Sequence, residues 1–390
     1  MTELVKALLD PNRPVFLLGD VPPMASTSPG EAQKIASKFL ARSRALASDG
    51  FIIYDIQDEP SRSGEARPFP FRQLTDPSRY AALVARTSGK DCLVYKCIDD
   101  EHFDEWVQTA ATEHGHAAIN VVGRPSSDGA PKGPSIPVAM AKVRASALHF
   151  GCVCIAERHT DEHAASRGRD KPTEHENMMK KQAAGAEWFV SQAVYDAAPT
   201  IRLLRDYAAA CRQAGLTPKK VVLTFAPCGR PKTMQFLKWL GVRVPEAAER
   251  RILDAESPVD ESVALCCELL DEILRETRGL GVPLGISVES VSIFKKEIDA
   301  VHDLFRKTQA MMLDSRASAW KVTWQSVDDT PADAPAANGQ LDKAKAAAVD
   351  ALAILDVDTL CKAATITAVG AAVSAFSALV MTLMVLRLRK

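Results

Sequence analysis

The chain has 390 residues, which is enough for one large domain or two ordinary ones. Its 48 lysines and arginines balance 49 aspartates and glutamates, so no net positive field is present to attract nucleic acid. The nine cysteines follow no metal-ligand spacing, and no metal site is predicted. The N-terminus has no uninterrupted apolar core, so no secretory signal is predicted, and the scattered cysteines favour buried thiols in a reducing compartment.

Eight short apolar runs recur along the first 300 residues, each followed by a longer helical pattern. The runs are 15–18, 50–56, 92–97, 117–122, 151–156, 188–192, 221–225 and 284–288. The amphipathic stretches between them include 30–47, 104–113, 136–149, 174–184, 198–214 and 261–278. Eight strands that alternate with helices predict a (β/α)8 barrel. A doubly wound open sheet is the alternative, but no Gly-rich dinucleotide-binding turn follows the first run.

The composition changes after Ser326, which places the end of the barrel near residue 325. Residues 328–341 are rich in Pro, Ala, Asp and Gly, and predict a flexible linker over 326–342. A short Ala-rich helix is expected within 343–362. Residues 363–386 then form a run of 24 residues without a charge, followed by a basic C-terminus.

This uncharged run is long enough to cross a membrane. A helix of that length measures about 36 Å, and the hydrocarbon core of a bilayer is about 30 Å thick. The sequence therefore predicts a C-terminal transmembrane helix that anchors the barrel on the cytosolic, reducing side of a membrane. A buried or oligomerising helix is the alternative, because the run is rich in Ala, Ser and Thr and its small residues suit contact between copies in a homo-oligomer.

The chemistry of such a barrel is expected where its strands end. Functional groups of (β/α)8 enzymes lie at the C-terminal ends of the strands. Polar residues at or just after the ends of the apolar runs include Asp20, Tyr54, Asn120, Glu157, His159, Gln192, Thr224 and Glu289. Each alone has an ordinary explanation as a solvated loop residue, but their common position predicts an active-site mouth.

Several of these segments resemble the methylenetetrahydrofolate reductase family of flavin-dependent (β/α)8 enzymes. The best match is 181–196, where a lysine, an Ala-Gly-Ala turn and a strand ending in Ser-Gln precede an aspartate. Residues 157–159 resemble the family's Glu-x-His after strand 5, residues 22–23 its double proline, and residues 242–245 its Val-Arg-Ile-Pro segment. The resemblance covers about residues 14–312.

The resemblance implies a role for individual residues. Glu157 and His159 would contact the flavin, and Lys181 would approach the FAD diphosphate with Asn177 beside it. A lysine suits that place because it is a point charge for phosphate. Gln192 would hydrogen-bond the pterin of a folate, since its amide can donate and accept in one plane. NAD(P)H would be the electron donor.

The chain also departs from the family pattern. The family's general acid is a glutamate three residues before the double proline, where this sequence has Gly19. Asp20 is adjacent and is the first candidate for the acid, with Glu289 and Glu157 in reserve. The aspartate that the family places against its flavin after strand 4 is not matched, which indicates a divergent branch.

The leading interpretation is a flavin-dependent oxidoreductase of one-carbon metabolism. FAD would carry a hydride from NAD(P)H to methylenetetrahydrofolate, a folate-type substrate. Two alternatives stay open: a barrel that binds folate without flavin turnover, and a scaffold subunit of a membrane complex. The colour of the purified protein distinguishes the first interpretation from the others.

Overall fold

The computed structural model describes residues 1–58, 67–123 and 130–314. The chain divides into two compact units, Met1–Trp324 and Gln325–Lys390, and all described residues belong to the first. No helix in these described ranges is both long and apolar enough to cross a membrane. The predicted linker, short helix and transmembrane segment lie outside the described residues.

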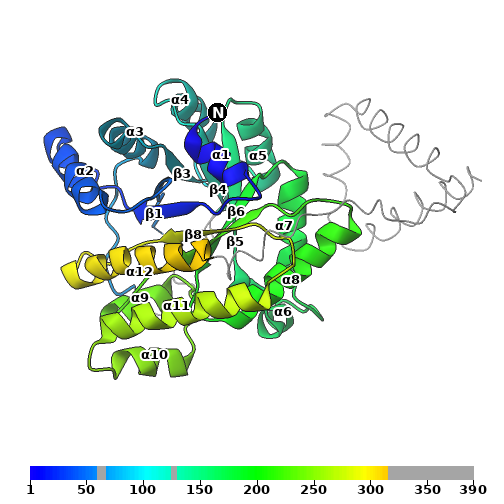
Figure 1. The fold of residues 1–390 in the computed structure, drawn as a ribbon. Coiled ribbons are helices and arrows are strands. Elements are labelled where there is room, and N and C mark those ends of the chain that lie inside the picture. Colours follow the sequence, from blue (N-terminus) through cyan, green and yellow to red (C-terminus); the bar gives the residue numbers. More distant parts are fainter. Residues whose placement is uncertain (59–66, 124–129, 315–390) are drawn as a thin grey trace, which may run out of the picture. The chain divides into compact units, whose positions relative to one another are not determined.

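Eight parallel strands form a closed barrel at the centre of the first unit, with helices around it (Figure 1). The strands are β1 (Phe16–Asp20), β2 (Gly50–Ile53), β3 (Cys92–Cys97), β4 (Ala118–Val122), β5 (His149–Cys154), β6 (Trp188–Ala193), β7 (Lys220–Phe225) and β8 (Leu284–Val288). Each strand pairs with the next, and β8 pairs with β1. The (β/α)8 prediction is confirmed, and every predicted apolar run overlaps a strand.

Helix α1 precedes the first strand, and the other helices follow the strands along the chain and lie around the barrel (Figure 1). They are α1 (Glu3–Leu9), α2 (Pro29–Ser43), α3 (Pro77–Ser88), α4 (Phe103–Thr112), α5 (Ile136–Arg144), η1 (Ala156–Arg158), α6 (Asp161–Ser166), α7 (Glu174–Ala183), α8 (Ala197–Gln213), α9 (Pro231–Trp239), α10 (Glu246–Leu253), α11 (Pro258–Glu276) and α12 (Lys295–Leu313).

The predicted helix over 136–149 was too long. The hydroxyl of Ser146 bonds the carbonyl of Val143 and the N–H of Leu148, and this local turn replaces further helical turns.

The N-terminal half of the barrel interior is packed with apolar side chains. Helix α1 contributes Leu4, Val5 and Leu8 to this cluster. The strands, with Val15 directly before β1, contribute Leu17, Ile52, Leu93, Ala118, Trp188, Val190 and Val222. Lys220 at the start of β7 donates from Nζ to the carbonyl of Ala7, in the last turn of α1, and to the carbonyl of Arg13 in the loop before β1.

Side-chain alternation then determines which residues face the C-terminal half of the interior. Successive side chains of a strand point to opposite faces, so residues two apart share a face. Leu17, Ile52, Ala118 and Val222 belong to the interior cluster. The residues two positions further on are Gly19, Tyr54, Asn120 and Thr224. On β8, Gly285 packs against Val15 of the interior, which places Ser287 and Glu289 on the inner face as well.

Candidate functional site

Polar side chains gather in the C-terminal half of the barrel interior. They are Tyr54, Asn120, Thr224, Ser287 and Glu289, which come from four different strands or the residues directly after them. Both amide atoms of Asn120 and the hydroxyl oxygens of Tyr54, Thr224 and Ser287 are buried without a well-formed hydrogen bond among the described residues. The hydroxyl of Tyr54 is still close enough to Glu289 and Ser287 to interact with both. Buried polar groups in proteins are normally paired, so this set is a candidate site for a polar ligand.

Glu289 is the carboxyl group of this set. Burial raises its pKa to about 7, and the nearby hydroxyl of Tyr54 opposes the rise. A Cβ added at Gly19 would lie 2.8 Å from Cβ of Glu289 and 2.9 Å from Cε2 of Tyr54. Glu289 and Tyr54 therefore fill the space that a side chain at position 19 would need. The carboxyl group at this level of the interior comes from β8 and not from β1.

Asp20 lies on the opposite face of β1 from Gly19. Its carboxylate accepts a hydrogen bond of 2.9 Å from the hydroxyl of Tyr80 on α3. Burial raises the pKa of Asp20 to about 6, although this hydrogen bond opposes the change. The first candidate for the acid thus lies between the barrel wall and α3, whereas Glu289 faces the interior.

Glu157 is a third carboxyl group with a raised pKa. It lies in η1, directly after β5, and burial raises its pKa to about 7. Its Oε2 is buried and has no hydrogen-bond partner in the described part of the chain. The charge of Asp196 contributes to the rise, and Asp196 is itself paired with Arg243 at 2.9 Å.

Lys181 and Asn177 connect α7 to the end of β5. Lys181 donates from Nζ to the carbonyl of Val153 at 2.7 Å. Asn177 donates to one carboxylate oxygen of Glu174 at 2.9 Å, and the other oxygen accepts the N–H of Ile155 at 3.2 Å. Lys181 and Asn177, both predicted to contact the cofactor, therefore form hydrogen bonds within the protein in this arrangement.

Gln192 also uses its amide within the protein. Its Nε2 donates to the carbonyl of Leu240 at 3.2 Å, and its Oε1 accepts the N–H of Ala193 at 3.2 Å. These bonds attach the end of β6 to the loop after α9. A folate that used Gln192 would have to displace them.

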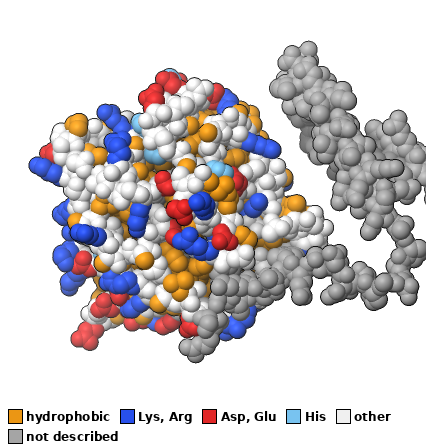
Figure 2. All heavy atoms as spheres, turned by 45° about the horizontal axis from the view of Figure 1, so that its top comes forward, with side chains coloured by type: hydrophobic (Ala, Val, Ile, Leu, Met, Phe, Trp, Pro, Cys, Tyr) orange, Lys and Arg blue, Asp and Glu red, His pale blue; other side chains and the backbone are white. Residues whose placement is uncertain are grey.

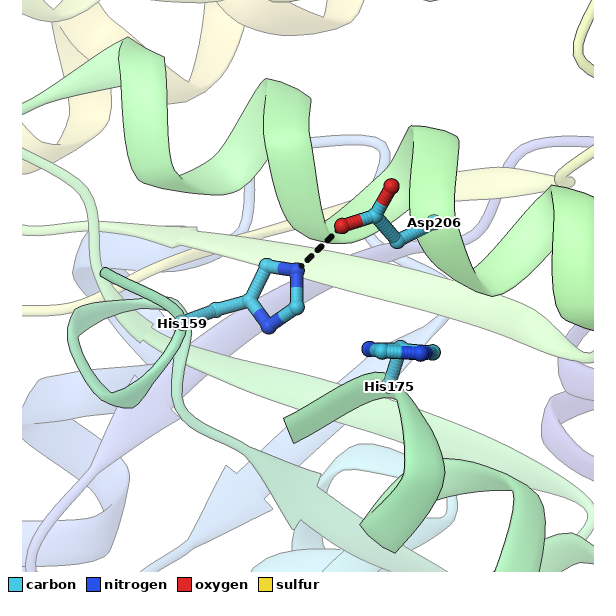
Figure 3. A group of neighbouring side chains, drawn as sticks. All are labelled: His159, His175 and Asp206. Atoms are coloured by element: carbon cyan, nitrogen blue, oxygen red, sulfur yellow. Dashed lines mark hydrogen bonds and ion pairs between the residues drawn. The ribbon is translucent and has the colours of Figure 1, made fainter. Parts of the chain in front are cut away.

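His159 lies in a cluster that the sequence did not reveal. Its ring is fully buried, and Nε2 is 2.8 Å from a carboxylate oxygen of Asp206 on α8. The ring of His175 on α7 stands edge-on to it, with 5.2 Å between ring centroids. Figure 3 shows the three side chains converging from the turn after η1, from α7 and from α8. Their separation in sequence follows no known ligand spacing, which is why no motif indicated them.

Two surface depressions lie away from these groups. One of about 570 Å³ is lined by residues such as Arg144, His149 and Glu187, near the start of β5. The other, of about 430 Å³, lies beside α4 and is lined by residues such as Phe103 and Lys142. Neither depression is lined by any of the unpaired buried groups, so the barrel interior is the stronger candidate for the functional site. The face in Figure 2 carries basic and acidic side chains interspersed.

Comparisons with known proteins place the barrel among solved structures. No family model and no curated protein matches the chain. An uncharacterized protein from Clostridium thermocellum, which binds two copies of 5-methyl-5,6,7,8-tetrahydrofolic acid, is 25% identical with a TM-score of 0.66. The match covers 79% of this chain and 100% of that chain.

More distant barrels were also found. Dihydropteroate synthase from Xanthomonas albilineans is 16% identical over 80% of this chain and 98% of that chain, with a TM-score of 0.41. A GH113 beta-1,4-mannanase is 12% identical over 76% and 98%, with a TM-score of 0.42. These two similarities carry no argument about function. The resemblance to methylenetetrahydrofolate reductases stays a prediction.

Proposed function

We propose that the barrel binds a reduced folate in the C-terminal half of its interior, with the pterin ring against Glu289 and Asn120. The observation that carries this proposal is the set of buried, unpaired polar groups around Glu289. The similarity of the whole barrel to a Clostridium thermocellum protein that binds 5-methyltetrahydrofolic acid supports the choice of ligand.

The chemistry of the side chains suits a pterin. A pterin presents neighbouring N–H donors and ring acceptors along one edge. A carboxylate accepts two N–H groups in one plane, and an amide both donates and accepts. The rings of Tyr54 and Tyr95 pack edge-to-face, 4.9 Å apart, and add an aromatic surface beside Glu289.

The test is a calorimetric titration of the full chain with 5-methyltetrahydrofolate. Glu289→Gln keeps the shape of the side chain but turns one acceptor into a donor that opposes the pterin N–H groups. Loss of a charged hydrogen bond of about 1.5–3 kcal/mol should weaken binding by roughly 10- to 100-fold. Asp20→Asn is the matched control, because it alters a carboxyl group on the other face of β1. No binding by the wild type, or equal losses in both variants, would reject the site.

Flavin-dependent reduction of the bound folate is a second proposal. A carboxyl group with a pKa of about 7, next to Gly19, is suited to donate a proton at neutral pH. Lys181 and Asn177 each use one donor within the protein, for the carbonyl of Val153 and the carboxylate of Glu174. The diphosphate of FAD would have to bind their remaining N–H groups or displace these bonds.

The colour of the purified full chain tests this second proposal. A yellow protein with flavin absorbance would support it. A colourless protein that added FAD cannot reconstitute would remove the reductase proposal and leave folate binding intact. The C-terminal membrane anchor and a homo-oligomeric state likewise stay predictions, to be tested by carbonate extraction and by sedimentation.

A further inference from the structure

We propose that His159, His175 and Asp206 form a binding site for a divalent transition-metal cation, separate from the folate site. One ligand atom from each residue lies within 4.8 Å of the other two (Figure 3). Zinc holds imidazole and carboxylate ligands at about 2.0–2.2 Å, so the three ligand atoms would have to draw closer together to share one ion.

The first argument is that ring nitrogens are left unsatisfied. Nδ1 of His159 and Nδ1 of His175 are both buried and have no hydrogen-bond partner among the described residues. Within the described part of the chain, Nε2 of His159 is hydrogen-bonded, to Asp206. A buried polar atom without a partner costs free energy, and here two such atoms belong to imidazoles beside one carboxylate. A cation bound between the three side chains would account for unpaired ring nitrogens at this place, whereas a His–Asp pair alone does not.

The second argument is charge. Asp206 supplies the carboxylate of the cluster, which is complementary to a divalent cation. The charge of Arg202 also reaches His159, but Arg202 is paired with Asp161 at 2.9 Å.

The third argument is access. His159 is fully enclosed, whereas the side chain of Asp206 is 45% exposed. Two imidazoles and one carboxylate are a ligand set used by zinc and by non-haem iron, with coordination positions left for water or another ligand. The ion would join η1, α7 and α8, and η1 also holds Glu157. The site is thus expected to stabilise the protein.

The experiment is a metal titration of the full chain after treatment with a chelator. Zn²⁺ binding is measured by calorimetry, and Co²⁺ binding by its visible absorption, which reports imidazole coordination. We expect one ion per chain and a higher melting temperature with Zn²⁺. His175→Gln and Asp206→Asn should each weaken binding by at least about tenfold, because each removes one of three ligands.

The matched control is His149→Gln. His149 also pairs with a carboxylate, Glu187, at 3.1 Å, but belongs to no three-residue cluster in the described part of the chain. It should leave the affinity unchanged. His159 is avoided as the main test because it is fully buried and its replacement risks misfolding. Absence of stoichiometric binding, or equal affinity in the His175→Gln and wild-type proteins, would overturn the proposal.

Discussion

The two halves of the barrel interior are built on the same eight strands but are filled differently. In the N-terminal half, α1 and the strand starts pack Leu, Val, Ile and Trp side chains against one another. In this half, the indole N–H of Trp188 is buried without a hydrogen-bond partner among the described residues. In the C-terminal half, the next inward positions carry Tyr54, Asn120, Thr224, Ser287 and Glu289, most with unpaired polar atoms.

This contrast separates stability from binding along each strand. Apolar burial in the N-terminal half supplies folding free energy, and that stability allows the other half to keep groups that are costly without a ligand. Function in this fold is expected at the C-terminal face, where the costly groups lie. Substitutions in the N-terminal half should therefore lower stability and spare ligand affinity, whereas substitutions in the C-terminal half should lower ligand affinity.

The largest effect is expected from Leu17→Ala in the N-terminal half. Leu17 is fully buried in the interior cluster, only two positions before Gly19. Removing its side chain should lower the free energy of unfolding by about 2–5 kcal/mol, because transfer and cavity costs add. Urea denaturation measures the loss, and folate titration of the folded variant should show unchanged affinity. A large loss of affinity without a loss of stability would abolish the distinction between the halves.

The next effect concerns the pH dependence of stability in the C-terminal half. Burial raises the pKa of Glu289 from 4.5 to about 7, so the folded state holds this proton more tightly than the unfolded state. The associated stability is present below the ordinary pKa and is lost as the pH rises through about 7. A rise of this size corresponds to at most about 3 kcal/mol.

Urea denaturation at pH 5 and pH 8 measures this difference. Glu289→Gln should reduce the loss of stability between the two pH values. Glu268→Gln is the control, because Glu268 is paired with Arg251 and its pKa is lowered. Identical pH profiles for the wild type and Glu289→Gln would show that Glu289 keeps its ordinary pKa.

A smaller loss is expected from Gly19→Ala. The new Cβ would lie under 3.0 Å from Glu289 and Tyr54, so one of the two must move. Such overpacking should cost about 1–3 kcal/mol of stability and should also weaken folate binding, unlike Leu17→Ala on the same strand. Gly30→Ala is the control, since nothing lies within 4 Å of its added Cβ. Equal behaviour of the two glycine variants would remove the packing argument.

The sequence predicted the barrel well because strand periodicity and the helix between strands are local signals. It predicted less of the site. Asn120, Thr224 and Glu289 were recognised as strand ends, and Ser287 could have been found two positions before Glu289 by alternation. The sequence did not predict whether Asp20 or Glu289 supplies the carboxyl group inside the barrel. Gly19 and Asp20 are neighbours on opposite faces of β1, so the choice depends on which of the two faces inward. His175 and Asp206 meet His159 only through the packing of α7 and α8 near η1.

The smallest effect on stability is expected from Thr224→Val. The hydroxyl of Thr224 is buried without a partner in the described residues, so a methyl group of similar shape removes a desolvation cost. The free energy of unfolding should stay the same or rise by up to about 1 kcal/mol, while folate affinity falls.

Thr308→Val is the matched control, because the equally buried hydroxyl of Thr308 donates to the carbonyl of Leu304 at 2.8 Å. That variant should lose about 0.5–1.5 kcal/mol and bind folate normally. If Thr224→Val instead lost as much stability as Thr308→Val, the hydroxyl of Thr224 would have a hydrogen-bond partner in the wild type. The polar groups of the C-terminal half would then be paired within the protein and would not require a ligand.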